Sequence, residues 1–140
     1  MQLFTPTGEK KDFRGEGCEA TLWFPAAGIV AARVKGHVRE RLASAIYAEI
    51  DAHTTSHQFP GIGFGDFADI TDFDWEARMV LVRWNLQHRA AAQRLHLLTS
   101  SPTVQLALRI MTIALGDTVV VHENRATLEA AYHAIVRLAP

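Results

Sequence analysis

The sequence predicts a single α/β domain with a mixed, mostly parallel sheet, an N-terminal hairpin and about four helices. Its 140 residues fit one domain. Two strand-like segments separated by a proline-to-glycine spacer form the start of the pattern. From the second of them, which begins at Ile29, strand-like and helix-like segments alternate four times. Such alternation is typical of parallel strands joined by crossover helices, and the hairpin adds an antiparallel edge.

Composition narrows the class of protein. The hydrophobic fraction of 49% and charged fraction of 21% are ordinary for a packed domain and exclude a disordered chain. A net charge of −1 gives no indication of nucleic-acid or anionic-membrane binding. The single cysteine, Cys18, cannot form an internal disulfide, which suits a reducing compartment.

We expect no targeting signal in the N-terminal segment. Residues 1–15 are charged and lack the apolar core of a signal peptide, and the most apolar helix, 103–115, is too short to span a membrane. We therefore expect a cytoplasmic protein without stable membrane insertion. Residues 1–17 are expected to form a loosely held lead-in, with a brief strand at Gln2–Thr5, and residues 18–140 to form the domain.

The opening hairpin is expected from two strand-like segments, Cys18–Phe24 and Ile29–Lys35. The spacer between them runs from Pro25 to Gly28, and its length and turn residues are typical of a hairpin connection. Gly36 is expected to end the second strand.

The unit that organises the chain lies in mid-sequence, at residues 64–84. An apolar run from Phe64 to Ile70 has the length of a strand. We expect it to be an interior parallel strand that ends in an acidic turn and opens a long, mostly buried helix over residues 75–92. The turn contains Asp69, Thr71, Asp72 and Asp74. One interpretation of Asp72, Asp74 and Glu76 is that they cap this helix.

Three further helices complete the alternation. An amphipathic helix is predicted over 38–53, and strands are predicted at Arg94–Leu98 and Thr118–His122. Ser101 and Pro102 predict the start of the helix 103–115, Gly116 its end, and Asn124 or Thr127 the cap of the last helix. The expected inner stripes are Val38, Leu42, Ile46 and Ile50; Val104, Leu108, Met111 and Leu115; and Leu128, Ala131, Tyr132, Ile135 and Leu138.

Two stretches carry a resemblance to a known family. They are Ala68–Ala77, ADITDFDWEA, and Thr118–Ala131, TVVVHENRATLEAA. Over about Ile29 to Leu138 the chain resembles the STAS superfamily, the fold of bacterial anti-sigma-factor antagonists, and more closely its divergent branch that is compared with lipid-binding Sec14-type domains. The resemblance implies a non-enzymatic regulatory or interaction module whose partners are regulatory kinases or anti-sigma-type proteins.

One departure from the family concerns phosphorylation. Its antagonists carry a phosphorylatable serine where the helix begins, but this chain has Asp74-Trp75-Glu76-Ala77 there and no serine between Ser56 and Ser100. A serine switch at the usual place is not expected, and the sequence leaves open whether Thr71 is modified. Glu76 is a candidate for a fixed negative charge at this position.

The acidic stretch is the candidate partner-binding surface, because partners meet the carboxyl ends of parallel strands. The candidate residues are Asp69, Thr71, Asp72, Asp74, Trp75 and Glu76. A basic partner would suit them. A divalent cation is the alternative occupant, but the stretch lacks the loop spacing of a calcium site. His53 and His57 have the i, i+4 spacing of a metal pair but lack a nearby third ligand, so neither a metal nor a cofactor is predicted.

Two alternating patterns have two interpretations each. Arg33, Lys35 and His37 form either an anion-binding stripe or the solvated face of an edge strand. Gly61, Gly63 and Gly65 leave one strand face bare, either for close backbone packing or for a shallow ligand groove.

A second functional hypothesis is the binding of an apolar small molecule or lipid between the sheet and the helices 75–92 and 103–115. The candidate residues for this pocket, or for a homodimer face, are Met79, Trp84, Leu106, Ile110 and Ile113. Burial under a neighbouring helix is the alternative. No nucleophile–base set is apparent, so an enzyme is the least favoured class.

Overall fold

The computed structural model describes residue 6 and residues 8–139, except for the side chains of Thr103, Ala107 and Met111. The described chain contains one six-stranded sheet in the order β1-β2-β3-β4-β5-β6. The strands are β1 (Glu9–Gly15), β2 (Cys18–Ala26), β3 (Ile29–Val38), β4 (Ile62–Phe73), β5 (Arg94–Thr99) and β6 (Val119–His122). The first three are antiparallel neighbours and β3 to β6 are parallel, which confirms the predicted hairpin and mixed sheet.

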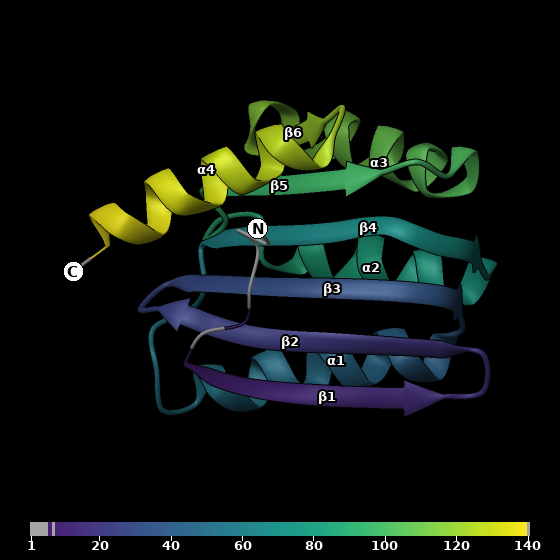
Figure 1. Ribbon diagram of the computed structural model, residues 1–140, viewed down its shortest axis with the longest axis horizontal. Helices are drawn as coiled ribbons and strands as arrows, with labels where there is room; N and C mark the ends of the chain where they lie inside the picture. The colour runs from purple at the N-terminus through teal and green to yellow at the C-terminus, as the bar shows by residue number, and fades with distance from the viewer. Residues whose placement is uncertain (1–5, 7, 140) are drawn as a thin grey trace.

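Helices connect the parallel strands and close the chain. They are α1 (Glu40–Thr54), α2 (Trp75–Gln87), α3 (Pro102–Leu115) and α4 (Arg125–Leu138), with a short 3₁₀ turn, η1 (Gly116–Thr118), before β6. Figure 1 shows α1 and α2 behind the sheet and α4 in front of it. None of the helices among the described residues has the length and apolar character needed to span a membrane.

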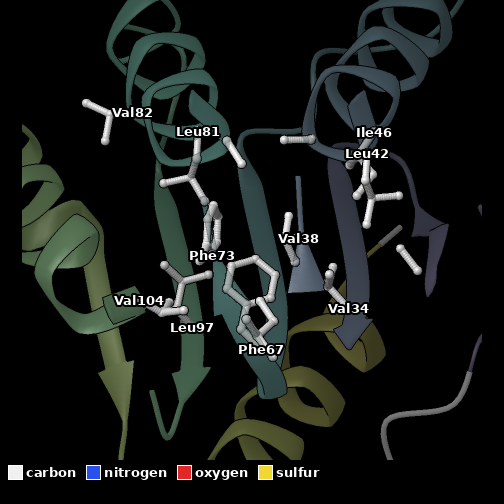
Figure 2. Close-up of a cluster of buried hydrophobic side chains, with 14 of the residues drawn as sticks. Val34, Val38, Leu42, Ile46, Phe67, Phe73, Leu81, Val82, Leu97 and Val104 are labelled. Carbon is white, nitrogen blue, oxygen red and sulfur yellow. The ribbon is translucent and has the colours of Figure 1, made fainter. Parts of the chain in front are cut away.

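The larger hydrophobic core lies between the sheet and the helices α1, α2 and α3. Figure 2 shows Phe67 and Phe73 of β4 at its centre, with Leu81 of α2, Leu97 of β5 and Val104 of α3 around them. These side chains are at most 9% exposed. Leu42, Ala43, Ile46 and Ile50 of α1 join this core, which confirms the predicted inner stripe of that helix from Leu42 onward.

A smaller core lies on the α4 side of the sheet. Leu128 and Tyr132 of α4 are buried against Trp23 of β2 and Phe64 of β4. The indole Nε1 of Trp23 donates a hydrogen bond to the Tyr132 hydroxyl at 2.9 Å, and Phe64 meets Tyr132 edge to face at a centroid distance of 5.2 Å. This face of the sheet therefore combines apolar packing with buried polar contacts.

The predicted helix boundaries are confirmed at two caps. The Ser101 hydroxyl accepts a hydrogen bond from the Val104 amide, with Pro102 at the first helical position, and the Asn124 side chain accepts one from the Thr127 amide. Gly116, at a φ of +61°, follows the last residue of α3. Asn124, rather than Thr127, is thus the cap of α4.

The central prediction of an interior parallel strand is confirmed, but its extent differs. β4 pairs with β3 and β5 and continues to Phe73, so Asp69, Thr71 and Asp72 lie on the strand and not in a turn. The cause is the parallel pairing of Asp69, Ile70 and Asp72 with the long end of β3, which outweighs the turn preference of this stretch; Thr71 lies at a register shift between these pairs. The following helix ends at Gln87 rather than at residue 92.

Four smaller expectations are corrected. Residues 9–15 are not a loose lead-in but the edge strand β1, paired along its length with β2. Gly36 does not end its strand, Val38 lies on β3 rather than on a helix, and Leu138 is 84% exposed beyond the sheet. The expected strand at Gln2–Thr5 and the side chain of Met111 lie outside the described residues.

Candidate functional site

The carboxyl ends of β3 and β4 and the start of α2 form one corner of the molecule. We call it the β4–α2 corner and define it by His37, Asp72, Asp74, Trp75 and Glu76. His37 and Asp72 are register partners on the neighbouring strands β3 and β4. The His37 Nε2 atom lies 2.6 Å from the Asp74 carboxylate and 3.7 Å from that of Asp72.

Backbone contacts fix the two sides of this corner. Gly36 has a φ of +90°, and a Cβ at this position would overlap the Gly17 carbonyl oxygen. That close approach lets the Gly17 carbonyl accept a hydrogen bond from the His37 amide at 2.9 Å. On the other side, the Asp74 amide donates to the Val38 carbonyl at 3.0 Å. The imidazole and the carboxylate are therefore held on anchored backbone.

The interpretation of Asp72 and Asp74 as side-chain caps is wrong. Asp74 occupies the N-cap position of α2, but its carboxylate makes no cap hydrogen bond and contacts His37 instead. The Asp72 carboxylate accepts a hydrogen bond from the Phe73 amide at 2.8 Å. Glu76 lies in the first turn, where its charge is favoured by the helix dipole.

Exposed side chains surround these carboxylates. Trp75 is 57% exposed and has the Arg78 guanidinium 5.3 Å from its ring centroid. Thr71, Asp72 and Glu76 are also exposed. Five of the six predicted partner-binding residues are thus close along the chain at the strand end and the first turn of the helix.

The sixth, Asp69, has a different environment. Its carboxylate lies 3.6 Å from Arg125 at the start of α4. Arg125 also donates two hydrogen bonds to the carboxylate of Asp66, at 3.0 and 3.2 Å, and Asp66 is only 1% exposed. The Asp66 carboxylate raises the pKa of Arg125.

Sequence reasoning did not pair Asp66 with Arg125. A signal was present, because Asp66 alternates with Phe64 and Ala68 on a strand predicted to be interior, and a buried carboxylate needs a cationic partner. The sequence does not indicate that this partner is Arg125, 59 residues further along the chain.

The alternating basic residues form neither an open anion stripe nor an edge. β3 lies between β2 and β4, so the edge-strand interpretation is wrong. Each of the three side chains has an acidic neighbour. Arg33 lies 3.8 Å from Asp66, Lys35 lies 2.6 Å from Glu19, and His37 contacts Asp74. The hydrogen bond from Lys35 lowers the pKa of Glu19.

A histidine pair, the buried His96 and the half-buried His122, lies on the α4 side of the sheet. The Thr127 hydroxyl donates to the Asn124 carbonyl and therefore accepts from His122 Nδ1 at 2.9 Å. In the neutral rings, His122 Nε2 then accepts from His96 Nδ1, also at 2.9 Å. Desolvation and the nearby His122 lower the pKa of His96 to about 4, and His96 Nε2 has no hydrogen-bond partner among the described residues. Sequence reasoning missed this pair.

An apolar cavity of about 100 Å³ lies between the sheet and the helices α1 and α2. Its wall includes Gly63 and Gly65 of β4, Tyr47 of α1, and Trp84 and Asn85 of α2. A Cβ on Gly63 would meet Leu95 at 2.9 Å, so the bare glycine face serves close packing and lines the cavity as well. Desolvation raises the pKa of Tyr47 to about 12, and its hydroxyl accepts a hydrogen bond from Asn85.

The residues predicted for an apolar pocket or dimer face are not brought together. Trp84 lines the cavity and stacks on Tyr47, whereas Met79 packs against the larger core. None of the described side chains of α3 lines the cavity, so the expectation that α3 forms one wall is not met by them. Instead its outer face is exposed, at Leu106 (50%), Ile110 (39%) and Ile113 (87%).

The histidine pair at the end of α1 is held by stacking and by a backbone contact. The rings of His53 and His57 stack with a centroid distance of 4.1 Å, and Phe24 stacks on the other side of His53 at 3.5 Å. His57 Nδ1 contacts the His53 carbonyl oxygen at 3.1 Å. Stacking and helix-end hydrogen bonding account for both rings.

Comparisons with known proteins agree with this architecture. No family model matches the sequence, and no curated protein matches it. The structure is similar to that of the anti-sigma factor antagonist SpoIIAA in its unphosphorylated form, with a TM-score of 0.59 and 18% sequence identity. The match covers 80% of this chain and 95% of the other. The six-stranded mixed sheet, the four helices and this likeness together identify a STAS-like fold.

Proposed function

We propose that this chain is a non-enzymatic regulatory module that binds a protein partner through the β4–α2 corner. The observation that carries the proposal is Trp75, whose side chain is 57% exposed in the first turn of α2 beside three carboxylates. Large exposed aromatic side chains dominate the binding energy of many protein interfaces. The corner also lies at the carboxyl ends of parallel strands, where α/β folds bind their ligands.

The chemistry of the corner favours a basic partner. Asp72 and Glu76 are exposed, and Asp74 is half-buried beside His37. A partner with lysine or arginine around a pocket for an indole ring would complement these groups. The fold supports a regulatory role, since the similar protein SpoIIAA is named as the antagonist of an anti-sigma factor, another protein. A kinase or anti-sigma-type protein is the proposed class of partner.

The test is capture of a partner from lysate by the immobilised chain, followed by affinity measurement with the purified partner. Asp72→Ala with Asp74→Ala should abolish capture, and Trp75→Ala should weaken binding by about 2 kcal/mol or more. The matched control is Glu9→Ala with Asp117→Ala, which removes the same charge at the opposite end of the strands. Equal capture by parent and corner variants, with unchanged circular dichroism, would contradict the proposal.

The cavity supports a second candidate function, the binding of a small apolar molecule. About 100 Å³ of apolar space suits a compact ligand rather than a whole lipid chain, since an engineered cavity of about 150 Å³ accommodates benzene. Native mass spectrometry should then detect a retained ligand. Ala43→Leu fills space at the cavity wall and should remove it, whereas retention by this variant would exclude the cavity as the site.

Self-association and location complete the proposal. The exposed apolar residues of α3, Leu106, Ile110 and Ile113, are the proposed contact with a second copy. A cytoplasmic location is proposed from the single cysteine, Cys18, which has no second cysteine to pair with and suits a reducing compartment.

A further inference from the structure

Three potential metal ligands converge at the β4–α2 corner. They are the imidazole of His37 and the carboxylates of Asp72 and Asp74, and one donor atom from each lies within 4.8 Å of the other two. The closest pair, His37 Nε2 and the Asp74 carboxylate, is 2.6 Å apart, and Asp72 is 3.7 Å from the same nitrogen. Among the described residues, no other group of three or more histidine, cysteine or carboxylate side chains has its ligand atoms this close together.

The spacing fits a small divalent ion. Zinc binds nitrogen and oxygen ligands at about 2.0–2.2 Å, and a tetrahedral arrangement then places the ligand atoms roughly 3.4 Å apart. The two distances from His37 Nε2, 2.6 and 3.7 Å, bracket that value. Binding therefore requires the His37–Asp74 separation to widen by less than about 1 Å and the His37–Asp72 separation to shorten slightly.

The backbone on both sides of the site is already anchored. The His37 amide is bonded to the Gly17 carbonyl, and the Asp74 amide to the Val38 carbonyl. Asp72 lies opposite His37 in the register of β3 and β4. The backbone of three ligands, from β3, β4 and the N-cap of α2, is thus held in place without the metal, which reduces the entropy lost when it binds.

We propose that His37, Asp72 and Asp74 form a Zn²⁺ site. One imidazole nitrogen and two carboxylates suit zinc better than magnesium, which prefers a shell of oxygen ligands and water. Any proton on His37 Nε2 passes to solvent when the metal takes its place. The α2 dipole opposes a cation with about half a unit charge, but two carboxylates in direct contact outweigh it.

The site leaves at least one coordination position for water or for a partner's side chain. Asp72 is 61% exposed at its side chain, so the open position faces the surface that we propose for protein binding. Zinc binding rests on and deepens that proposal as its regulation, because a bound cation offsets the charge of Asp72 and Asp74 and so weakens the attraction of a basic partner to the corner. Zinc affinity is measured on the chain alone, so an absence of zinc binding is distinguishable from an absence of partner binding.

Isothermal titration with ZnCl₂ tests the site. The parent for this experiment is the full chain carrying His53→Gln and His57→Gln, which removes the stacked histidines as a competing site. We expect one bound ion, no heat from MgCl₂ at the same concentration, and affinity at least about tenfold weaker after His37→Gln or Asp74→Asn. Glu9→Gln with Asp117→Asn is the control and should titrate like the parent.

Two results would overturn the site. One is a parent that binds no Zn²⁺, and the other is a His37→Gln variant with the affinity of the parent. Asp72→Asn guards against a folding artefact, because this exposed side chain is replaced by one of the same shape. Its affinity should also fall while its circular dichroism and thermal midpoint remain those of the parent, and undiminished affinity would exclude Asp72 as a ligand.

Discussion

The two faces of the sheet are stabilised by different kinds of contact. On one face, α1, α2 and α3 cover a large core of aliphatic and aromatic side chains, among them Phe67 and Leu97. On the other, α4 covers a smaller core, into which Asp66, His96 and the Trp23–Tyr132 hydrogen bond are built. Hydrophobic burial is non-directional, whereas each buried polar contact requires one particular partner.

The two faces therefore contribute differently to the stability of the fold. The three-helix face supplies most of the apolar burial and so most of the favourable free energy of folding. The α4 face fixes the position of one helix through directional contacts, including the double hydrogen bond from Arg125 to Asp66. Substitutions on the two faces should therefore differ in their dependence on charge and pH.

The largest expected effect on the α4 face comes from Asp66→Ala. Removing this buried carboxylate leaves Arg125 and Arg33 without their shared anion and should lower the free energy of unfolding by about 3 kcal/mol. Asp69→Ala is the matched control, because this exposed carboxylate is 3.6 Å from the same arginine and should cost less than about 1 kcal/mol. Urea denaturation measures both, and equal losses would contradict a special role of the buried pair.

The next effect is pH dependence centred on His96. Its pKa is about 4 in the folded chain and 6.5 in the unfolded chain, so protonation favours unfolding, and stability falls as pH drops from 6.5 toward 4. Between pH 7 and pH 5 this group should remove about 2 kcal/mol. Urea denaturation at both pH values measures this difference.

Two variants separate His96 from the other titrating groups. His96→Gln should reduce the loss between pH 7 and pH 5, whereas His133→Gln, at an exposed histidine, should leave it unchanged. A His96→Gln profile identical to that of the parent would assign the pH dependence elsewhere.

The parts of the fold that depend on local sequence signals could be predicted, and the parts that depend on particular long-range partners could not. The order of elements, the central strand and the caps at Ser101 and Asn124 were predictable, because apolar periodicity and cap residues act locally. The length of β4 was not, because Asp69 and Asp72 favour turns on their own and are held in the strand by pairing with Lys35 and His37 of β3. The edge strand β1 was missed because it is polar and has one neighbour.

A smaller effect is expected at the two helix caps, which lie on opposite faces of the sheet. Ser101→Ala and Asn124→Ala should each lower the free energy of unfolding by about 1 kcal/mol, since each removes one hydrogen bond to an orphan amide. The Asn124 bond is the shorter, at 3.0 Å against 3.4 Å. Thermal unfolding of the pair measures both, and a loss above about 3 kcal/mol for Asn124→Ala alone would show that the α4 face depends on its cap.

The smallest effect on stability is expected at Ile113, which is 87% exposed on the outer side of α3. Ile113→Glu should change the free energy of unfolding by less than about 0.5 kcal/mol. If this surface contacts a second copy, the same change should convert a dimer to a monomer in analytical ultracentrifugation. A parent that is monomeric at every concentration would remove self-association from the proposal.

The candidate site was predictable in part. Asp72, Asp74, Trp75 and Glu76 were expected to share a surface, because they are consecutive or nearly so at the end of a predicted parallel strand. His37 was not assigned to that surface. Its place there depends on the register of β3 against β4 and on the close approach of Gly36 to Gly17, neither of which is a local property of the sequence.

The most direct test of the proposed recognition surface compares two exposed positions on the three-helix side. A photo-crosslinking amino acid replaces Trp75 in one variant and Ile113 in another, and each is illuminated with the purified partner. We expect a crosslink to the partner from position 75. From position 113 we expect no crosslink to the partner, and the only crosslink consistent with the proposal is one to a second copy of the chain. A partner crosslink from position 113 alone would contradict recognition through the β4–α2 corner.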